Sequence, residues 1–279
     1  TRLLLSSTTR IGVENPCFRE AINTFLLADA EVVPHPVDEE GIVLNERPCD
    51  YYYVTPGHQV PTGVTMSSAR RRQLLEHAAR HDAVIIEDDY DSESNFTLNP
   101  LPALKASDRS GRVVHVSSLS KALSPGLRLG FMVADPDLID EARALRRLVY
   151  RHPPTNIQYQ MAHFLAQGHY ETHLRRYHYD SAQRWERLHA ALQRYLPSCR
   201  ALAGSEHANA FWLQTPAQIN TQQLTWRAAH AGVLIEPGAR HFLSAAPPDN
   251  YFRMGFHAIN PDAIAQGVEV LRGQLEQMG

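Results

Sequence analysis

The chain has 279 residues, of which 43% are hydrophobic and 20% are charged, so it holds enough apolar material for a sizeable core. This length favours one large domain with a smaller one beside it. A formal net charge of -3 provides no broad attraction to nucleic acid or to an anionic membrane. Apolar runs all fall short of the ~20 residues that a bilayer span needs. The cysteines Cys17, Cys49 and Cys199 stand far apart, which argues against a disulfide scaffold and favours a reducing, cytoplasmic compartment.

The first half of the chain alternates strand-like and helix-like segments. Residues 1–16 resemble the end of a helix followed by a strand, so we expect that further sequence precedes them. Apolar, aromatic and β-branched runs predict strands over 10–15, 30–37, 49–57, 83–90, 112–118 and 128–135. Helical periodicity predicts helices over 17–29 and 67–82. Alternation of this kind implies βαβ units and a mainly parallel sheet that is covered on both faces.

The second half of the chain changes in character. Residues 136–196 are almost wholly helical in pattern, with one interruption at 152–156. After Pro197, short strands mix with helices, and the strands are expected at 209–215, 231–238 and 250–256. We therefore predict a large domain over residues 1–185 and a smaller α+β domain over residues 186–279.

Polar side chains follow two of the predicted strands at the point where each strand ends. In an open parallel sheet, ligands bind beyond the carboxyl ends of the strands. The segment AVIIEDDYDSE ends one strand in acidic residues, and a period of two places Asp88 and Tyr90 on the same face. The segment VVHVSSLSK ends the next strand with Ser118, Ser120 and Lys121. We expect an acid, a phenol, hydroxyls and an amine to converge on one crevice.

Pyridoxal 5'-phosphate needs this set of groups. A lysine amine forms a Schiff base with a carbonyl, and a carboxylate keeps a pyridine nitrogen protonated so that the ring accepts electrons. These needs assign Lys121 to the Schiff base and Asp88 to the ring nitrogen. A phenol can bind the ring oxygen, and a hydroxyl with an arginine can hold a phosphate. Tyr90 is therefore assigned to the ring oxygen, and Ser118 with Arg128 to the phosphate.

The segments EDDYDSE, TPGHQVPTG and SLSKALSPGLRLG resemble the C-terminal domain of MocR-type transcriptional regulators of the GntR superfamily. The resemblance runs through nearly the whole chain. It implies the α/β fold of type I pyridoxal-phosphate aminotransferases, a mainly parallel sheet flanked by helices with a smaller α+β domain. In that family the aminotransferase-like domain binds pyridoxal phosphate and an amine effector, while a separate N-terminal winged-helix domain binds DNA.

The resemblance implies roles for further residues. In ENPCF, Phe18 takes the position of an aromatic that stacks on the pyridine ring, with Cys17 in place of the usual glycine. In GHQVPTG, His58 or Gln59 approaches the ring oxygen. In NYFRMGF, Arg253 grips the effector's carboxylate, for which its planar fork is suited. The cofactor-binding set is thus Phe18, His58, Gln59, Asp88, Tyr90, Ser118, Ser120, Lys121 and Arg128.

Three functions follow from these expectations. The first is an effector-binding and oligomerisation domain, in which an amine or amino acid forms an external aldimine with the pyridoxal phosphate of Lys121; half-transamination is within its chemistry, and turnover is not implied. The second is a catalytic class I/II aminotransferase acting on amino and keto acids. The third is a cofactor-free homologue retained for protein contacts. The family's phosphate loop lies upstream of Thr1, so we expect an N-terminally truncated domain with an incomplete pocket and weakened or absent cofactor binding.

The partners expected for the first function are a small amine effector and a second copy of the chain. DNA would be contacted only through a winged-helix domain that this chain does not contain, and no membrane is involved. A metal site is not expected: His169 and His173 are one helical turn apart, but Tyr170 stands where zinc proteases have glutamate and no third ligand follows.

Overall fold

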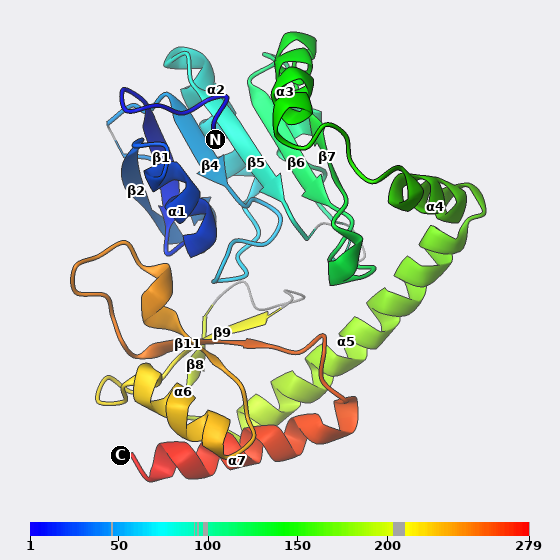
Figure 1. Cartoon of the computed structure of the whole chain (residues 1–279). Helices are drawn as coiled ribbons and strands as arrows, with labels where there is room; N and C mark the ends of the chain where they lie inside the picture. Colours follow the sequence, from blue (N-terminus) through cyan, green and yellow to red (C-terminus); the bar gives the residue numbers. More distant parts are fainter. Residues whose placement is uncertain (46, 92, 94, 97–99, 203–209, 279) are drawn as a thin grey trace.

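A computed structural model gives the fold. It describes residues 1–45, 47–91, 93, 95–96, 100–202 and 210–278. The first seven strands are β1 (Arg10–Asn15), β2 (Glu31–Asp38), β3 (Gly41–Ile42), β4 (Tyr51–Val54), β5 (Val84–Asp89), β6 (Val113–Ser118) and β7 (Gly130–Val133). They form one sheet in the order β3-β2-β1-β4-β5-β6-β7 (Figure 1). The five strands from β2 to β6 in this order run parallel, and the two edge strands β3 and β7 are antiparallel to their neighbours.

The second part of the chain contains a smaller antiparallel sheet. Its strands are β8 (Arg200–Ala201), β9 (Ala210–Gln214), β10 (Glu236–Pro237) and β11 (Tyr251–Gly255), in the order β10-β11-β9-β8. The α-helices are α1 (Arg19–Leu26), α2 (Ser68–Arg80), α3 (Pro136–Val149), α4 (Thr155–Ala166), α5 (His169–Tyr195), α6 (Thr221–His230) and α7 (Ile264–Glu276). Short 3-10 helices are η2 (Leu104–Ser107), η3 (Pro125–Leu127), η4 (Gly238–His241) and η5 (Pro261–Ala263).

The elements predicted in the first half of the chain are confirmed. The strands at the centre of the large sheet are buried because their side chains are apolar or aromatic, and Tyr52, Ile85 and Val113 are fully enclosed. Helix α2 begins where the serines predicted it, since the Ser67 side chain accepts a hydrogen bond from the Arg70 N–H at 3.1 Å. The fold class predicted from the sequence is therefore the observed one.

Helix α5 joins the two sheets. Its second half packs into the core of the smaller sheet through Leu188 and Leu192, against Phe211 of β9 and Phe252 of β11. The predicted division after residue 185 falls within this helix and stays a prediction. None of the helices in the described part of the chain has the length and apolar character that a bilayer span requires.

Three local features differ from the sequence expectations. Residues 1–5 form a single hydrogen-bonded turn, with Leu5 N donating to Thr1 O at 2.8 Å. Strand β10 spans Glu236–Pro237 instead of the predicted 231–238, because Ala231 still caps α6 and Gly232 has a left-handed φ of 86°. The sheet is not covered on both faces at its β7 edge, where Phe131 and Val133 are 47% and 45% exposed. As an edge strand, β7 has a neighbour on one side only.

Candidate functional site

The candidate residues gather at one edge of the large sheet. Strands β1, β4, β5 and β6 are parallel neighbours, so their carboxyl ends lie side by side, and this edge faces the smaller sheet (Figure 1). The segments that follow these ends carry Phe18 after β1, His58 and Gln59 after β4, Asp88 and Tyr90 around the end of β5, and Ser118, Ser120 and Lys121 around the end of β6. The alignment of four strand ends thus brings these residue types to one place.

Asp88 is held from the neighbouring strand. The buried Tyr53 of β4 donates its hydroxyl hydrogen to Asp88 Oδ2. Burial raises the pKa of Asp88, and burial together with the Asp88 charge raises the pKa of Tyr53 well above its usual value. Glu87 lies on the opposite face, where its Oε2 accepts from His115 Nδ1 at 2.9 Å. The predicted alternation of faces along this strand is therefore correct, and it directs Asp88 away from the Glu87 pair.

Lys121 lies against the aromatic ring that follows β5. Its Nζ is 4.3 Å from the centroid of the Tyr90 ring, and the Tyr90 hydroxyl donates to the carbonyl of His58 at 3.0 Å. Burial lowers the pKa of Lys121, opposed by the charges of Asp91 and Asp88. The residue as a whole is exposed, and it lines a cavity. An amine that loses its proton more readily is suited to attack a carbonyl.

The loop after β4 is tied down by its own side chains. Gln59 Nε2 donates to the Pro16 carbonyl at 2.8 Å, and Gln59 Oε1 accepts from Thr62 Oγ1 at 2.6 Å. His58 Nδ1 donates to Asp91 Oδ2 at 3.0 Å, and both side chains are buried. These bonds hold the loop to the ends of β1 and β5. Which of His58 and Gln59 approaches a cofactor's ring oxygen stays a prediction.

Glu14, at the end of β1, is a buried acid that the sequence analysis missed. Its Oε2 accepts from the Thr55 hydroxyl at 2.7 Å and from Gln59 Nε2 at 3.3 Å. Burial raises its pKa to about 7. The available signals were the acid Glu14 near the end of the strand-like run RIGVEN and, for Tyr53, the third tyrosine of YYYV. Glu14 supports the loop after β4 through Thr55 and Gln59, and Tyr53 supports Asp88, which the sequence did identify.

Ser118 and Arg128 lie at the same end of the β6–β7 pair. Ser118 is opposite Gly130 in the antiparallel register, and Arg128 precedes Gly130 by two residues. A Cβ at Gly130 would lie 2.5 Å from the Ser117 carbonyl oxygen, so the close strand approach requires glycine. Arg128 is exposed and has a left-handed φ of 48°, a conformation uncommon outside glycine. Ser118 Oγ accepts from the Ser120 N–H at 3.2 Å.

Arg253 and Lys121 line the same cavity. Its volume is about 930 Å³, and its walls come from the Ala231–Glu236 connection, β11 and the first half of α7. Arg253 lies in register with Glu236, with 3.5 Å between Nη1 and Oε2. Phe18 is 38% exposed at the start of α1. Of the predicted residues, Arg253 is thus the one that the smaller sheet contributes.

His257 also lines this cavity and was missed by the sequence analysis. Its ring stacks on Tyr177 at 5.5 Å with an interplanar angle of 8°, and its Nδ1 lies 3.2 Å from both the Tyr177 hydroxyl and Ser181 Oγ. Burial lowers its pKa to about 4, so the imidazole is neutral at pH 7. Its position between α5 and the cavity gives it a polar but uncharged face there.

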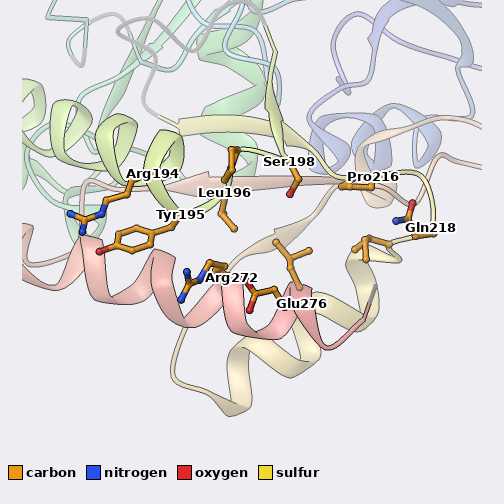
Figure 2. Close-up of a pocket in the computed structure, with 11 residues that line it drawn as sticks. Arg194, Tyr195, Leu196, Ser198, Pro216, Gln218, Arg272 and Glu276 are labelled. Carbon is orange, nitrogen blue, oxygen red and sulfur yellow. Dashed lines mark ion pairs between the residues drawn. The ribbon is translucent and has the colours of Figure 1, made fainter.

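A second cavity lies at the other end of the smaller sheet. It has a volume of about 400 Å³ and lies between the ends of α5 and α7, with Tyr195, Arg272 and Glu276 on its walls (Figure 2). Arg272 Nε is 3.7 Å from Glu276 Oε1. None of the residues at the strand ends contributes to it, so it is separate from the site around Lys121.

Comparison with known families places this geometry in context. The family model described as aminotransferase class I and II matches residues 2–271. The chain therefore belongs to the aminotransferase class I and II family, and its fold is that of the type I pyridoxal-phosphate enzymes.

Among curated relatives, the HTH-type transcriptional regulator TauR of Rhodobacter capsulatus is 37% identical over 96% of this chain and 55% of its own length. The probable rhizopine catabolism regulatory protein MocR of Rhizobium meliloti is 34% identical over 97% of this chain and 55% of its own length. The chain thus spans about half the length of these regulators. Among solved structures, the multiple substrate aminotransferase of Thermococcus profundus has a TM-score of 0.92, with 27% identity over 99% of this chain and 72% of that one.

The residues present fit pyridoxal phosphate, the cofactor that this fold implies. An amine with a lowered pKa, a carboxylate fixed by a buried phenol, and a hydroxyl beside an arginine lie along adjacent strand ends. This donor set matches an aldehyde, a pyridine nitrogen and a phosphate, in that order.

Proposed function

We propose that this chain is the effector-binding domain of a transcriptional regulator, binding pyridoxal phosphate at Lys121 and sensing a small amine or amino acid. The observation that carries the proposal is that Lys121, whose pKa burial lowers, shares one cavity with Arg253. The relatives named as transcriptional regulators support the regulatory role.

In this proposal the chain's own residues hold and orient the cofactor. When bound, pyridoxal phosphate supplies an aldehyde that reacts with amines and a ring that accepts electrons. Lys121 holds it covalently, and its lowered pKa provides a larger fraction of free amine than an ordinary lysine has. Asp88, fixed by Tyr53, binds the ring nitrogen, and Tyr90 binds the ring oxygen.

The remaining candidate residues bind the two ends of the complex. Ser118 and Arg128 hold the phosphate, and Ser120 shapes the turn through its N–H bond to Ser118. Phe18 covers one face of the ring. On the other side of the cavity, Arg253 binds the carboxylate of an amino-acid effector through its planar fork.

The wider assembly follows from the same proposal. DNA binding belongs to a winged-helix domain outside this chain, because the regulators extend well beyond the length that the chain covers. The chain works as a homodimer, and its place of action is the cytoplasm. Occupancy of the cavity is reported by a change in how the two sheets are arranged.

A catalytic aminotransferase is the second candidate. The observation that favours it is the match to the Thermococcus profundus enzyme over 99% of the chain. Repeated transfer of amino groups from an amino acid to a keto acid, measured over many turnovers, would favour this candidate over the regulator.

The decisive test uses the fact that the chain has two lysines, Lys105 and Lys121. The purified chain is mixed with pyridoxal phosphate, its absorption spectrum is recorded, and borohydride then fixes the bound cofactor for peptide mapping. We expect a visible band and an adduct on Lys121, lost in Lys121→Ala and kept in Lys105→Ala. A band that survives Lys121→Ala, or an adduct confined to Lys105, would rule out the proposed site. Addition of amines should then shift the band of the wild-type chain.

A further inference from the structure

Glu236 is a charged neighbour of Arg253 in the smaller sheet. The two residues are directly opposite in the antiparallel register of β10 and β11, and 3.5 Å separates Glu236 Oε2 from Arg253 Nη1. Side chains at opposed positions of such a pair lie on the same face and interact. The sequence analysis assigned no role to Glu236.

Two further side chains lie close to the other oxygen of Glu236. Arg240 Nη1 and His241 Nε2 each lie 3.4 Å from Oε1. The contact with His241 and the charges of Arg253 and Arg240 lower the pKa of Glu236 to about 2. Glu236 is therefore ionised at pH 7. Its Oε2 lies next to Arg253, and its Oε1 lies next to the two residues of η4.

Helix η4 is in turn fixed to the large sheet. His241 Nδ1 donates to the Cys17 carbonyl at 2.9 Å, and the Cys17 N–H donates to the His241 carbonyl at 2.9 Å. Arg240 Nη2 also pairs with Glu20 of α1 at 3.0 Å. The two residues that lie next to Glu236 Oε1 are thus tied to the turn that carries Phe18 and to α1. Movement of Glu236 away from Arg253 would also move it away from these two residues.

Trp212 bounds Arg253 on its other side. It lies opposite Arg253 in the β9–β11 register and is 1% exposed. Its ring stacks on Tyr251 at 5.6 Å with an interplanar angle of 16°. In the cross-strand register Arg253 thus lies between Glu236 of β10 and Trp212 of β9, and its side chain lines the cavity.

We propose that Glu236 is a positioning residue that holds one edge of the Arg253 guanidinium and so presents the rest of it to the carboxylate of an effector with an apolar body. The inference rests on the function proposed above and names its ligand class. The apolar part is indicated by the cavity walls, where Val233, Leu234 and Ile259 lie beside the charged groups.

The charges of the cavity are compatible with this ligand. The charged residue types on its walls are two basic ones, Lys121 and Arg253, and one acidic one, Glu236, so a carboxylate is still attracted. A simple counter-ion would compete with the ligand for Arg253, and its removal would strengthen carboxylate binding. A positioning residue has the opposite effect, because without it the long arginine side chain regains its rotamer freedom.

The test compares two probes of the same shape on the purified chain, hexanoate and the neutral hexanamide, by calorimetry with tryptophan fluorescence as a second readout. Wild type should prefer hexanoate. Glu236→Gln should weaken hexanoate binding by about tenfold and leave hexanamide unchanged. Glu236→Asp should restore part of the preference. The control Glu269→Gln, which removes an exposed acid of α7 paired with Arg272, should match wild type.

Several results would overturn the proposal. Hexanoate binding to Glu236→Gln could be unchanged or tighter, both probes could be weakened equally, or wild type could show no preference. Neither probe is an amine and neither needs the cofactor. A failure to fix pyridoxal phosphate on Lys121 would therefore refute the proposed function while leaving this comparison measurable.

Discussion

The two ends of the candidate site are built differently. At the end formed by β4 and β5, Tyr53 donates to Asp88, while Gln59 donates to the Pro16 carbonyl and accepts from Thr62, and these bonds are buried or partly buried. At the end formed by β6 and β7, Ser118 is partly exposed and Arg128 is exposed on a left-handed turn. The first end is shaped before any ligand arrives, because buried polar groups must be satisfied within the protein. The second end offers charge and hydroxyls at the surface.

The largest expected effect concerns Glu14 at the enclosed end. Its pKa is about 4.5 in an unfolded chain and about 7 in the fold, so the folded state binds the proton more tightly between these values. The stability that this provides is complete below pH 4.5 and is lost as the pH rises through 7. Glu14→Gln cannot ionise and should lack this loss.

Urea unfolding at pH 4.5 and pH 8 measures the difference. We expect the wild type to lose on the order of 3 kcal/mol relative to Glu14→Gln between these two values. Parallel stability profiles for the two proteins would show that the Glu14 carboxyl is not held protonated by burial, and the enclosed end would then be less distinct from the open one.

The second effect concerns the pair between Tyr53 and Asp88. Tyr53→Phe removes the hydroxyl that Asp88 accepts from, leaving a partly buried carboxylate without that donor. We expect a loss of about 2 kcal/mol in the free energy of unfolding. Tyr51→Phe, on the same strand, is the matched control and should change stability little. Equal losses in both variants would mean that the pair contributes nothing specific.

The smallest effect on stability is expected at the open end. Arg128→Ala should change the free energy of unfolding by less than about 0.5 kcal/mol, because the side chain is exposed. The affinity of the Arg128→Ala variant for pyridoxal phosphate should nevertheless fall by about tenfold, since a charged contact to the phosphate is lost. Spectral titration, with Arg109→Ala as the control, measures this. A large loss of stability would contradict the division into two ends.

The sequence predicted the residues whose position follows from a strand end, and it missed those whose role depends on a partner elsewhere. Asp88, Tyr90 and Lys121 follow apolar runs and stand out locally. Tyr53 and Glu14 act through partners 35 and 41 residues away, and a strand pattern does not show which distant side chain lies opposite.

The fold class was predictable because alternating strands and helices permit few architectures, and the family match confirms it. Glu236 was not, because its role comes from cross-strand register with Arg253 in a strand of two residues. In the run AGVLIEPG, Ala231 caps α6 and Gly232 adopts a left-handed φ, so the strand begins at Glu236 and is shorter than the apolar run suggested. The exposed face of β7 was also missed, since an apolar run does not reveal whether its strand has neighbours on both sides.

The 27-residue helix α5 connects the turn that carries Lys121 to the core of the smaller sheet. Near its start, His173 Nε2 donates to the carbonyl of Ala122, the residue after Lys121, at 2.7 Å. Its far half is embedded in the core around Leu188 and Leu192. At 1.5 Å per residue the helix is about 40 Å long, so a tilt of about 5° displaces its far end by roughly 3 Å. A small tilt of α5 at the lysine turn would thus displace the core of the smaller sheet by more than the turn itself moves.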